Sequence, residues 1–141
     1  MSLELQRIKR TDERILKNMH NHYSQPKGFV GRNICYAVLF DKVYYGAIVA
    51  GSATRFLPGR NDVFGNFELN EIINNIFFHI EPVNERYPIR NFSQLVLKQF
   101  RWWSSIHWQL KYGDFVKGFE TLVEKPRTGQ IYIRDGWKSC W

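Results

Sequence analysis

A tyrosine near the end of the chain has the surroundings of a proton donor. Tyr132 lies in the segment R-T-G-Q-I-Y-I-R-D-G-W, four residues before the pair Gly136-Trp137. A phenol can donate a proton to a leaving group without being charged beforehand, so this residue type suits general acid catalysis. The alternative is a half-buried tyrosine that packs its helix on a sheet. Taken alone, the pattern favours this structural role.

The residues Arg90, Asn91, Phe92, Ser93 and Gln94 are a second candidate, because they begin the clearest helix of the sequence. Backbone N–H groups at the start of a helix point outward, and the helix dipole favours negative charge there, so such an end can bind anions. Arg90 would add a positive charge. Ordinary capping by Asn91 or Ser93 explains the same residues about as well.

Charge and aromatic content favour nucleic acid as a partner without requiring it. Twenty Lys and Arg against thirteen Asp and Glu leave a net charge of +7, which attracts polyanions. No run of five basic residues occurs, so a mildly basic, solvated surface is the alternative. Arg55 and Arg60 flank an apolar pair and could hold phosphates beside a wedge. Trp102 lies off the apolar stripe of its helix and could stack on a base, whereas Trp103 and Trp108 are expected to be packed.

Several familiar catalytic and metal sites are missing from the sequence. It contains no G-x-S-x-G, G-x-x-x-x-G-K-[ST], H-E-x-x-H or paired C-x-x-C motif, which argues against serine hydrolases, P-loop enzymes, zincins and zinc fingers. Cys35 and Cys140 lack the spacing of a disulfide framework, so a reduced, intracellular setting is expected. No apolar run approaches the ~18 residues of a membrane span, and no membrane partner is expected.

The elements that must position these residues follow from the periodicity of apolar side chains. We expect strands at 3–8, 33–40, 43–53, within 67–81 and at 118–124, and a final extended piece at 137–141. Helices are expected after a cap at Thr11, over 92–105 and over 126–135. Asp41-Lys42 has the spacing of a hairpin turn. The order β-α-β-β-β-α-β-α-β predicts one α/β or α+β domain over residues 1–141, with a mixed sheet and helices on its faces.

Motifs along the chain resemble those of known families. The tyrosine followed by a glycine–aromatic pair is similar to the fourth-helix motif of the GNAT acyltransferase superfamily. N-H-Y-S at 21–24, F-E-L-N at 67–70, R-N-F-S at 90–93, F-E-T-L-V-E-K-P-R-T-G-Q-I-Y at 119–132 and G-W at 136–137 resemble, in this order, the Mom family of phage DNA-modification proteins. Residues 107–137 are also similar to the GNAT-like DruA domain of the Druantia defence system. The resemblance implies a GNAT-like, mostly antiparallel sheet. The chain would then be either a compact family member or one that lacks a last strand, which a second chain could supply, as in a homodimer.

The resemblance also implies a function. Mom proteins add a carbamoylmethyl group to the N6 amine of adenine in DNA and so protect phage DNA from restriction. The implied protein is a transferase in the bacterial cytoplasm that takes acetyl-CoA or another acyl-CoA as donor and DNA as acceptor. The donor's pyrophosphate would lie at the helix start near Arg90. The catalytic roles fall on His22, Tyr23, Glu124 and Tyr132.

Three departures from the family predict a changed substrate or weaker activity. The glycine-rich loop usual before the pyrophosphate-binding helix is not present, Glu71 stands where the family has arginine, and Glu124 stands where it has aspartate. Two other functions therefore stay open. One is an acyltransferase that acts on a small-molecule or protein amine, and the other is a non-catalytic GNAT-like module that binds nucleic acid.

The implied roles are chemically reasonable. An exocyclic adenine amine is a poor nucleophile, and Glu124 or neutral His22 could accept its proton during attack. Tyr23 could stack on an extruded base. His22 and Glu124 are too few ligands to predict a metal, so that question stays open. The implied enzymatic function predicts that Tyr132 converges with His22 and Tyr23 at the mouth of a crevice that holds the thioester.

Overall fold

The computed structural model describes residues 2–22, 28–29, 31–53, 57, 59–123 and 129–139. Three of the predicted site residues, Tyr23, Arg55 and Glu124, lie outside the described residues. The elements are β1 (Leu3–Ile8), α1 (Glu13–Asn21), β2 (Asn33–Phe40), β3 (Val43–Ser52), α2 (Arg60–Phe64), the 3-10 turn η1 (Leu69–Glu71), β4 (Ile72–Ile80), α3 (Phe92–Tyr112), β5 (Gly118–Glu120) and α4 (Gln130–Arg134). This composition confirms the predicted α+β class.

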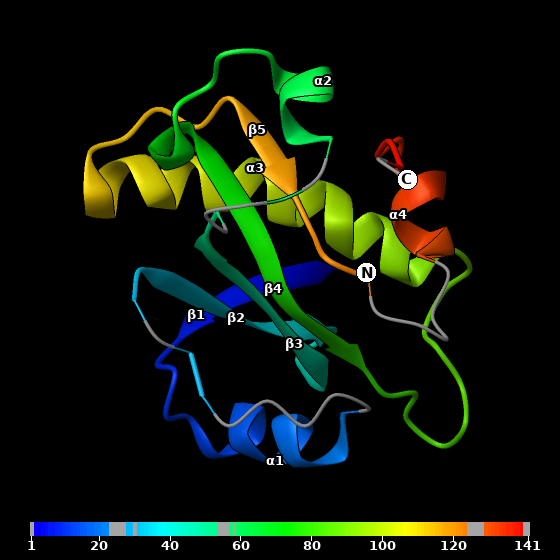
Figure 1. Cartoon of the computed structure of the whole chain (residues 1–141). Helices are drawn as coiled ribbons and strands as arrows, with labels where there is room; N and C mark the ends of the chain where they lie inside the picture. Colours follow the sequence, from blue (N-terminus) through cyan, green and yellow to red (C-terminus); the bar gives the residue numbers. More distant parts are fainter. Residues whose placement is uncertain are drawn as a thin grey trace.

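The five strands form one sheet in the order β1-β2-β3-β4-β5. The first four are antiparallel neighbours, and β5 pairs with β4 in parallel after the chain returns through α3 (Figure 1). The predicted hairpin turn between β2 and β3 is confirmed. Asp41 and Lys42 both have positive φ, 47° and 68°, as in the two-residue turns whose twist matches a hairpin.

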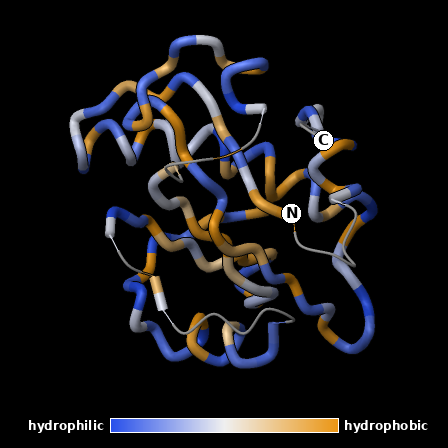
Figure 2. Tube along the Cα trace, in the orientation of Figure 1, coloured by the Kyte–Doolittle hydropathy of each residue, from blue (hydrophilic) through white to orange (hydrophobic). Residues whose placement is uncertain are grey.

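Side chains of the sheet pack into two hydrophobic clusters, one on each face. Ile34 and Tyr36 of β2 belong to the cluster with α3, whereas Cys35 between them belongs to the cluster with α1. Ile48 and Val49 of β3 divide in the same way. Helices therefore cover both faces, as predicted, with α1 on one and α3 on the other (Figure 1). Figure 2 shows hydrophobic residues concentrated in the central strands and hydrophilic ones in the outer connections.

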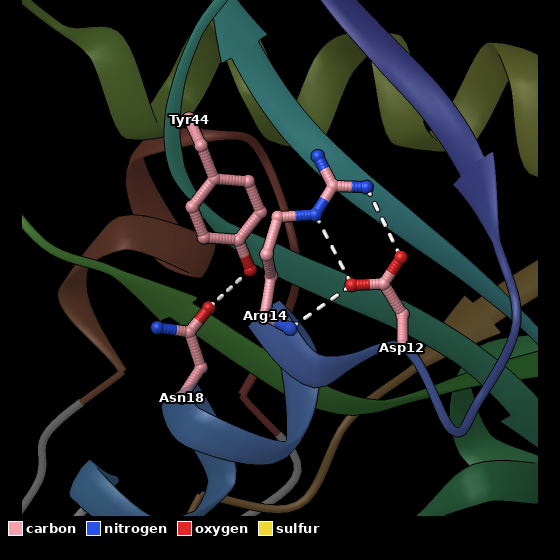
Figure 3. Close-up of polar contacts among 4 residues, drawn as sticks. All are labelled: Asp12, Arg14, Asn18 and Tyr44. Atoms are coloured by element: carbon pink, nitrogen blue, oxygen red, sulfur yellow. Dashed lines mark hydrogen bonds and ion pairs between the residues drawn. The ribbon is translucent and has the colours of Figure 1, made fainter.

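Helix α1 is tied to β3 by a set of polar contacts. Its cap is Asp12 rather than the predicted Thr11, because the Asp12 carboxylate accepts a hydrogen bond from the Arg14 N–H at 2.9 Å. The same carboxylate binds the Arg14 guanidinium through both oxygens at 3.1 Å (Figure 3), and this hydrogen bonding lowers the pKa of Asp12. Arg14 also lies over the ring of Tyr44, whose hydroxyl donates to Asn18.

Helix α3 continues past its predicted end at 105. It stops at Tyr112 because Gly113 has a φ of 79° and its N–H donates to the carbonyl of Gln109 at 2.8 Å. Trp108 is fully buried on the sheet, as predicted. Trp103 was predicted to be core and is instead 41% exposed, stacked on the ring of His107.

Three further segments differ from the sequence prediction. A short helix, α2, forms inside the predicted loop at 55–66. Strand β5 has three residues, although the strand was predicted to reach 124. Helix α4 begins only after Gly129, whose φ is 73°, and the predicted start at 126 lies outside the described residues. Within the described part of the chain, no helix combines the length and apolar character that crossing a bilayer requires.

Candidate functional site

Strands β4 and β5 separate partway along β4. They pair only at Ile72–Gly118, Ile73–Phe119 and Asn74–Glu120, after which β5 ends while β4 continues to Ile80. Among the described residues, no strand pairs with β4 on this side beyond Asn74. The second half of β4 therefore has an edge that β5 does not cover.

Asn75 marks the point of separation. On the β3 side the register skips Ile76, so a bulge interrupts the ladder here. The Asn75 amide nitrogen donates to the carbonyls of Val49 and Phe77, both at 3.0 Å, and is buried. Because its nitrogen is used in this way, the Asn75 side chain is held in one orientation, with its oxygen directed away from the two carbonyls.

Tyr132 binds that oxygen. The Tyr132 hydroxyl donates to Asn75 Oδ1 at 2.6 Å, and its ring packs edge-on against Trp137 with centroids 5.0 Å apart. Helix α4 is held by Asp135, which forms a two-pronged ion pair with Arg101 at 2.9 Å and accepts from the Trp137 indole at 2.7 Å. The phenol is therefore fixed at the point where β4 and β5 separate.

A cavity of about 400 Å³ lies beside this phenol. Phe64, Phe119 and Trp137 contribute aromatic walls, and the cavity also borders α2, β5 and the residues after α4. Its size falls within the range of small-molecule sites, and its walls combine apolar surface with a few polar groups.

A buried ion pair forms one polar wall of the cavity. The Arg60 guanidinium binds both carboxylate oxygens of Glu120, at 2.7 and 2.8 Å, and the two side chains are only 8% and 4% exposed. This geometry satisfies two buried charges at once. The placement differs from the exposed, phosphate-binding Arg60 that the sequence predicted, because α2 turns the side chain inward.

His22 lies in a different cluster. Its Nδ1 is 2.9 Å from Nδ1 of His79 on β4, and Nε2 of His79 is 2.8 Å from a carboxylate oxygen of Glu81. The His22 ring also packs edge-on against Phe77, with centroids 4.7 Å apart. Phe77 belongs to the hydrophobic cluster on the α1 face.

The predicted convergence of His22 and Tyr132 in one crevice is not observed. Tyr132 packs on the α3 face and His22 on the α1 face. Their contacts on β4, Asn75 and Phe77, are two residues apart, or about 7 Å along the strand. The two side chains thus flank the same stretch of β4 from opposite faces, and His22 is not among the described residues that line the cavity.

The predicted anion site at the start of α3 is separate from the cavity. Arg90 and Asn91 are exposed, Phe92 is buried in the core, and Ser93 and Gln94 are half-buried. Asn91 has a φ of 59°, and no side chain of the described residues caps the helix. The first N–H groups of α3 thus have no side-chain cap there. None of these five residues is among the described residues lining the cavity.

Two other residues from the sequence analysis have clear surroundings. Trp102 is 66% exposed on α3, so its indole is open to solvent. Glu71 accepts from the N–H of Glu68 at 2.8 Å and forms an ion pair with Lys117, whose own N–H donates to the Glu71 carbonyl at 2.7 Å. The Lys117 hydrogen bond lowers the pKa of Glu71. Through these contacts Glu71 anchors the start of β5.

Sequence reasoning missed Asn75, Glu120, His79 and Glu81. The run I-I-N-N-I-F-F-H at 72–79 contained a signal for two of them, because polar residues inside an apolar strand require dedicated partners. Glu120 had no comparable local signal. Among the described residues, no group of three or more His, Cys, Asp or Glu is arranged to hold a metal ion.

Comparisons of the chain with family models, with curated proteins and with solved structures found no match.

Proposed function

We propose that the chain is a GNAT-like transferase that moves a group from an acyl-CoA donor to the N6 amine of adenine in DNA. The observation that carries the proposal is the Tyr132 hydroxyl, held by Asn75 where two parallel strands separate. The GNAT resemblance implies a strand and a helix whose start holds the pyrophosphate, followed by a parallel strand and a helix that carries the tyrosine. The order β4-α3-β5-α4 agrees with that requirement.

The described residues fit a long, partly peptide-like donor. The Asn75 carbonyl accepts from the Thr121 hydroxyl at 2.9 Å and the Phe77 carbonyl from the Asn75 amide at 3.0 Å. Beyond these, the edge of β4 that β5 does not cover continues toward the connection to α3, where peptide groups could hydrogen-bond the amides of an extended chain. At the far end, the uncapped first turn of α3 and exposed Arg90 would meet the phosphates. The cavity beside Tyr132 would receive the thioester end.

In this arrangement the chemistry of the chain is proton transfer. As the acceptor nitrogen attacks, the bond from the transferred group to sulfur breaks, and Tyr132 would give its proton to the departing sulfur. The acceptor loses one proton to a base at the same time. The net charge of +7 and the exposed indole of Trp102 favour DNA as the molecule that presents the amine.

The test is coexpression with plasmid DNA, digestion to nucleosides and mass spectrometry. We expect a modified deoxyadenosine from the wild type, and its loss by about 100-fold or more in Tyr132→Phe, because the general acid is removed. Tyr87→Phe is the matched control, since Tyr87 is an exposed tyrosine on the connection before α3. Only unmodified deoxyadenosine from the wild type would refute the DNA acceptor.

Titration with acetyl-CoA separates the remaining functions. A ligand that binds the folded state raises the melting temperature with concentration. Stabilisation without DNA modification would point to a small-molecule or protein amine as acceptor. The lack of any stabilisation would instead favour a non-catalytic nucleic-acid-binding module.

A further inference from the structure

We propose that His79 and Glu81 are positioning residues that hold His22 as the general base for the acceptor amine. The proposal rests on the transferase function above and adds the side of the molecule from which the acceptor approaches. It starts from three side chains in contact, because Glu81 contacts His79 and His79 contacts His22.

The hydrogen bonds among these three side chains determine which imidazole nitrogens carry protons. An ionised carboxylate only accepts, so Nε2 of His79 must carry the proton that is donated to Glu81. With His79 neutral, its Nδ1 then holds a lone pair. In that form the 2.9 Å contact between the two Nδ1 atoms is made by His22 donating its Nδ1–H, whereas a protonated His79 would donate in the opposite direction. His22 is thereby held as the Nδ1–H tautomer, with the basic lone pair on Nε2.

The surroundings keep the His22 ring in this orientation. Phe77 packs edge-on against His22, and the ring of His79 stacks on that of Phe77 with centroids 6.2 Å apart. The His79 side chain is 13% exposed, whereas that of Glu81 is 48% exposed. The contacts thus connect the solvated carboxylate of Glu81, through the mostly buried imidazole of His79, to His22.

The position of His22 assigns the two substrates to opposite faces of β4. Tyr132 serves the leaving sulfur on the α3 face, and His22 lies over the adjoining stretch of β4 on the α1 face. Among the described residues β5 does not cover the edge of β4 beyond Asn74, and it is past this edge that an amine on the α1 face would approach the transferred group beside Tyr132. The proton that the attacking nitrogen loses passes to Nε2 of His22. The Nδ1 contact to His79, itself bound to Glu81, stabilises the resulting imidazolium.

The direct test is the tautomer of His22, read from long-range proton–nitrogen correlation spectra of the full chain. An unconstrained imidazole prefers the Nε2–H form, so the Nδ1–H form at His22 in the wild type is diagnostic. Glu81→Ala removes the acceptor for His79, and we expect His22 to shift toward the Nε2–H form. Glu85→Ala is the matched control, because Glu85 is an exposed acid on the same connection after β4, and it should leave the spectrum unchanged.

Two results would overturn the proposal. One is an Nε2–H tautomer at His22 in the wild type, and the other is a His22 signal that does not respond to Glu81→Ala. Stoichiometric perturbation of both imidazoles by added Zn²⁺ would also overturn it and make the pair a metal site. None of these readouts needs turnover, so they stand apart from failure of the transferase function.

Turnover adds a second criterion where DNA modification is detected. Glu81→Ala should lower kcat by about tenfold or more with KM nearly unchanged, because an imidazole in the wrong tautomer presents N–H where a lone pair is needed. Glu85→Ala should match the wild type. A Glu81→Ala variant that keeps full kcat would refute the positioning role.

Discussion

The ion pair between Arg60 and Glu120 gives the sharpest energetic prediction. Its two side chains are 8% and 4% exposed, so Glu120→Leu removes the carboxylate that binds a buried guanidinium through both oxygens. Breaking such a pair costs about 3–5 kcal/mol. The total stability of a domain is roughly 5–15 kcal/mol, so Glu120→Leu should remove a large part of it and lower Tm by roughly 10 °C or more.

The assay is urea unfolding followed by tryptophan fluorescence, with three variants compared at one pH. Asp114→Leu is the matched control, because its ion pair with Arg32 is 30% and 39% exposed and should be worth at most about 1 kcal/mol. The double variant Arg60→Met with Glu120→Leu should recover most of the lost stability, since an apolar pair of similar volume avoids burying charge. A loss below about 1 kcal/mol in Glu120→Leu would refute the reasoning.

Two further predictions concern pH and close packing. Burial, and then the charge of Arg7, lower the pKa of His107 below its ordinary 6.5. As pH falls, the unfolded chain therefore binds a proton at this histidine before the folded chain does. The free energy of unfolding should then decrease as pH drops below 6.5. Urea titrations at a pH above and a pH below that value should show this slope reduced in His107→Gln, and an equal slope would contradict it. A Cβ at Gly46 would lie 1.9 Å from the carbonyl oxygen of His79, so Gly46→Ala should cost about 3 kcal/mol or more. Gly28→Ala, where a Cβ would meet no atom of the described residues within 4 Å, should stay within about 0.5 kcal/mol, and equal losses in the two variants would be the contrary result.

The sheet was predictable because its signals are local. The continuous apolar run at 34–40, buried on both faces of the sheet, and the polar pair Asp41-Lys42 predict β2, the turn and the start of β3 from neighbouring residues alone. The end of α3 was predicted too early, because the apolar stripe was followed only to 105. Trp108 continues that stripe, and the helix ends at Gly113, a residue type that tolerates the left-handed conformation.

The site was only partly predictable, because its key contacts join distant parts of the chain. Tyr132 was singled out from its own motif, but its partner Asn75 lies 57 residues away. Arg60 and Glu120 are 60 residues apart, so an arginine in a polar loop gave no sign that it would be buried. The convergence of His22 with Tyr132 failed as a prediction because which face of a sheet a side chain meets depends on tertiary packing.

Because β5 pairs with β4 over a short stretch, β5 and α4 are held less firmly than the central strands of the sheet. Only three residue pairs join β5 to β4, and the region carrying the phenol is otherwise held to the rest in part by charged contacts, Lys117 with Glu71 and Arg101 with Asp135 among them. Dissolved ions weaken these contacts far more than they weaken a backbone ladder or a packed core. Concentrated salt should therefore speed amide hydrogen exchange in β5 and α4 while β2 and β3 keep their protection, so that β5 and α4 open as a unit of their own.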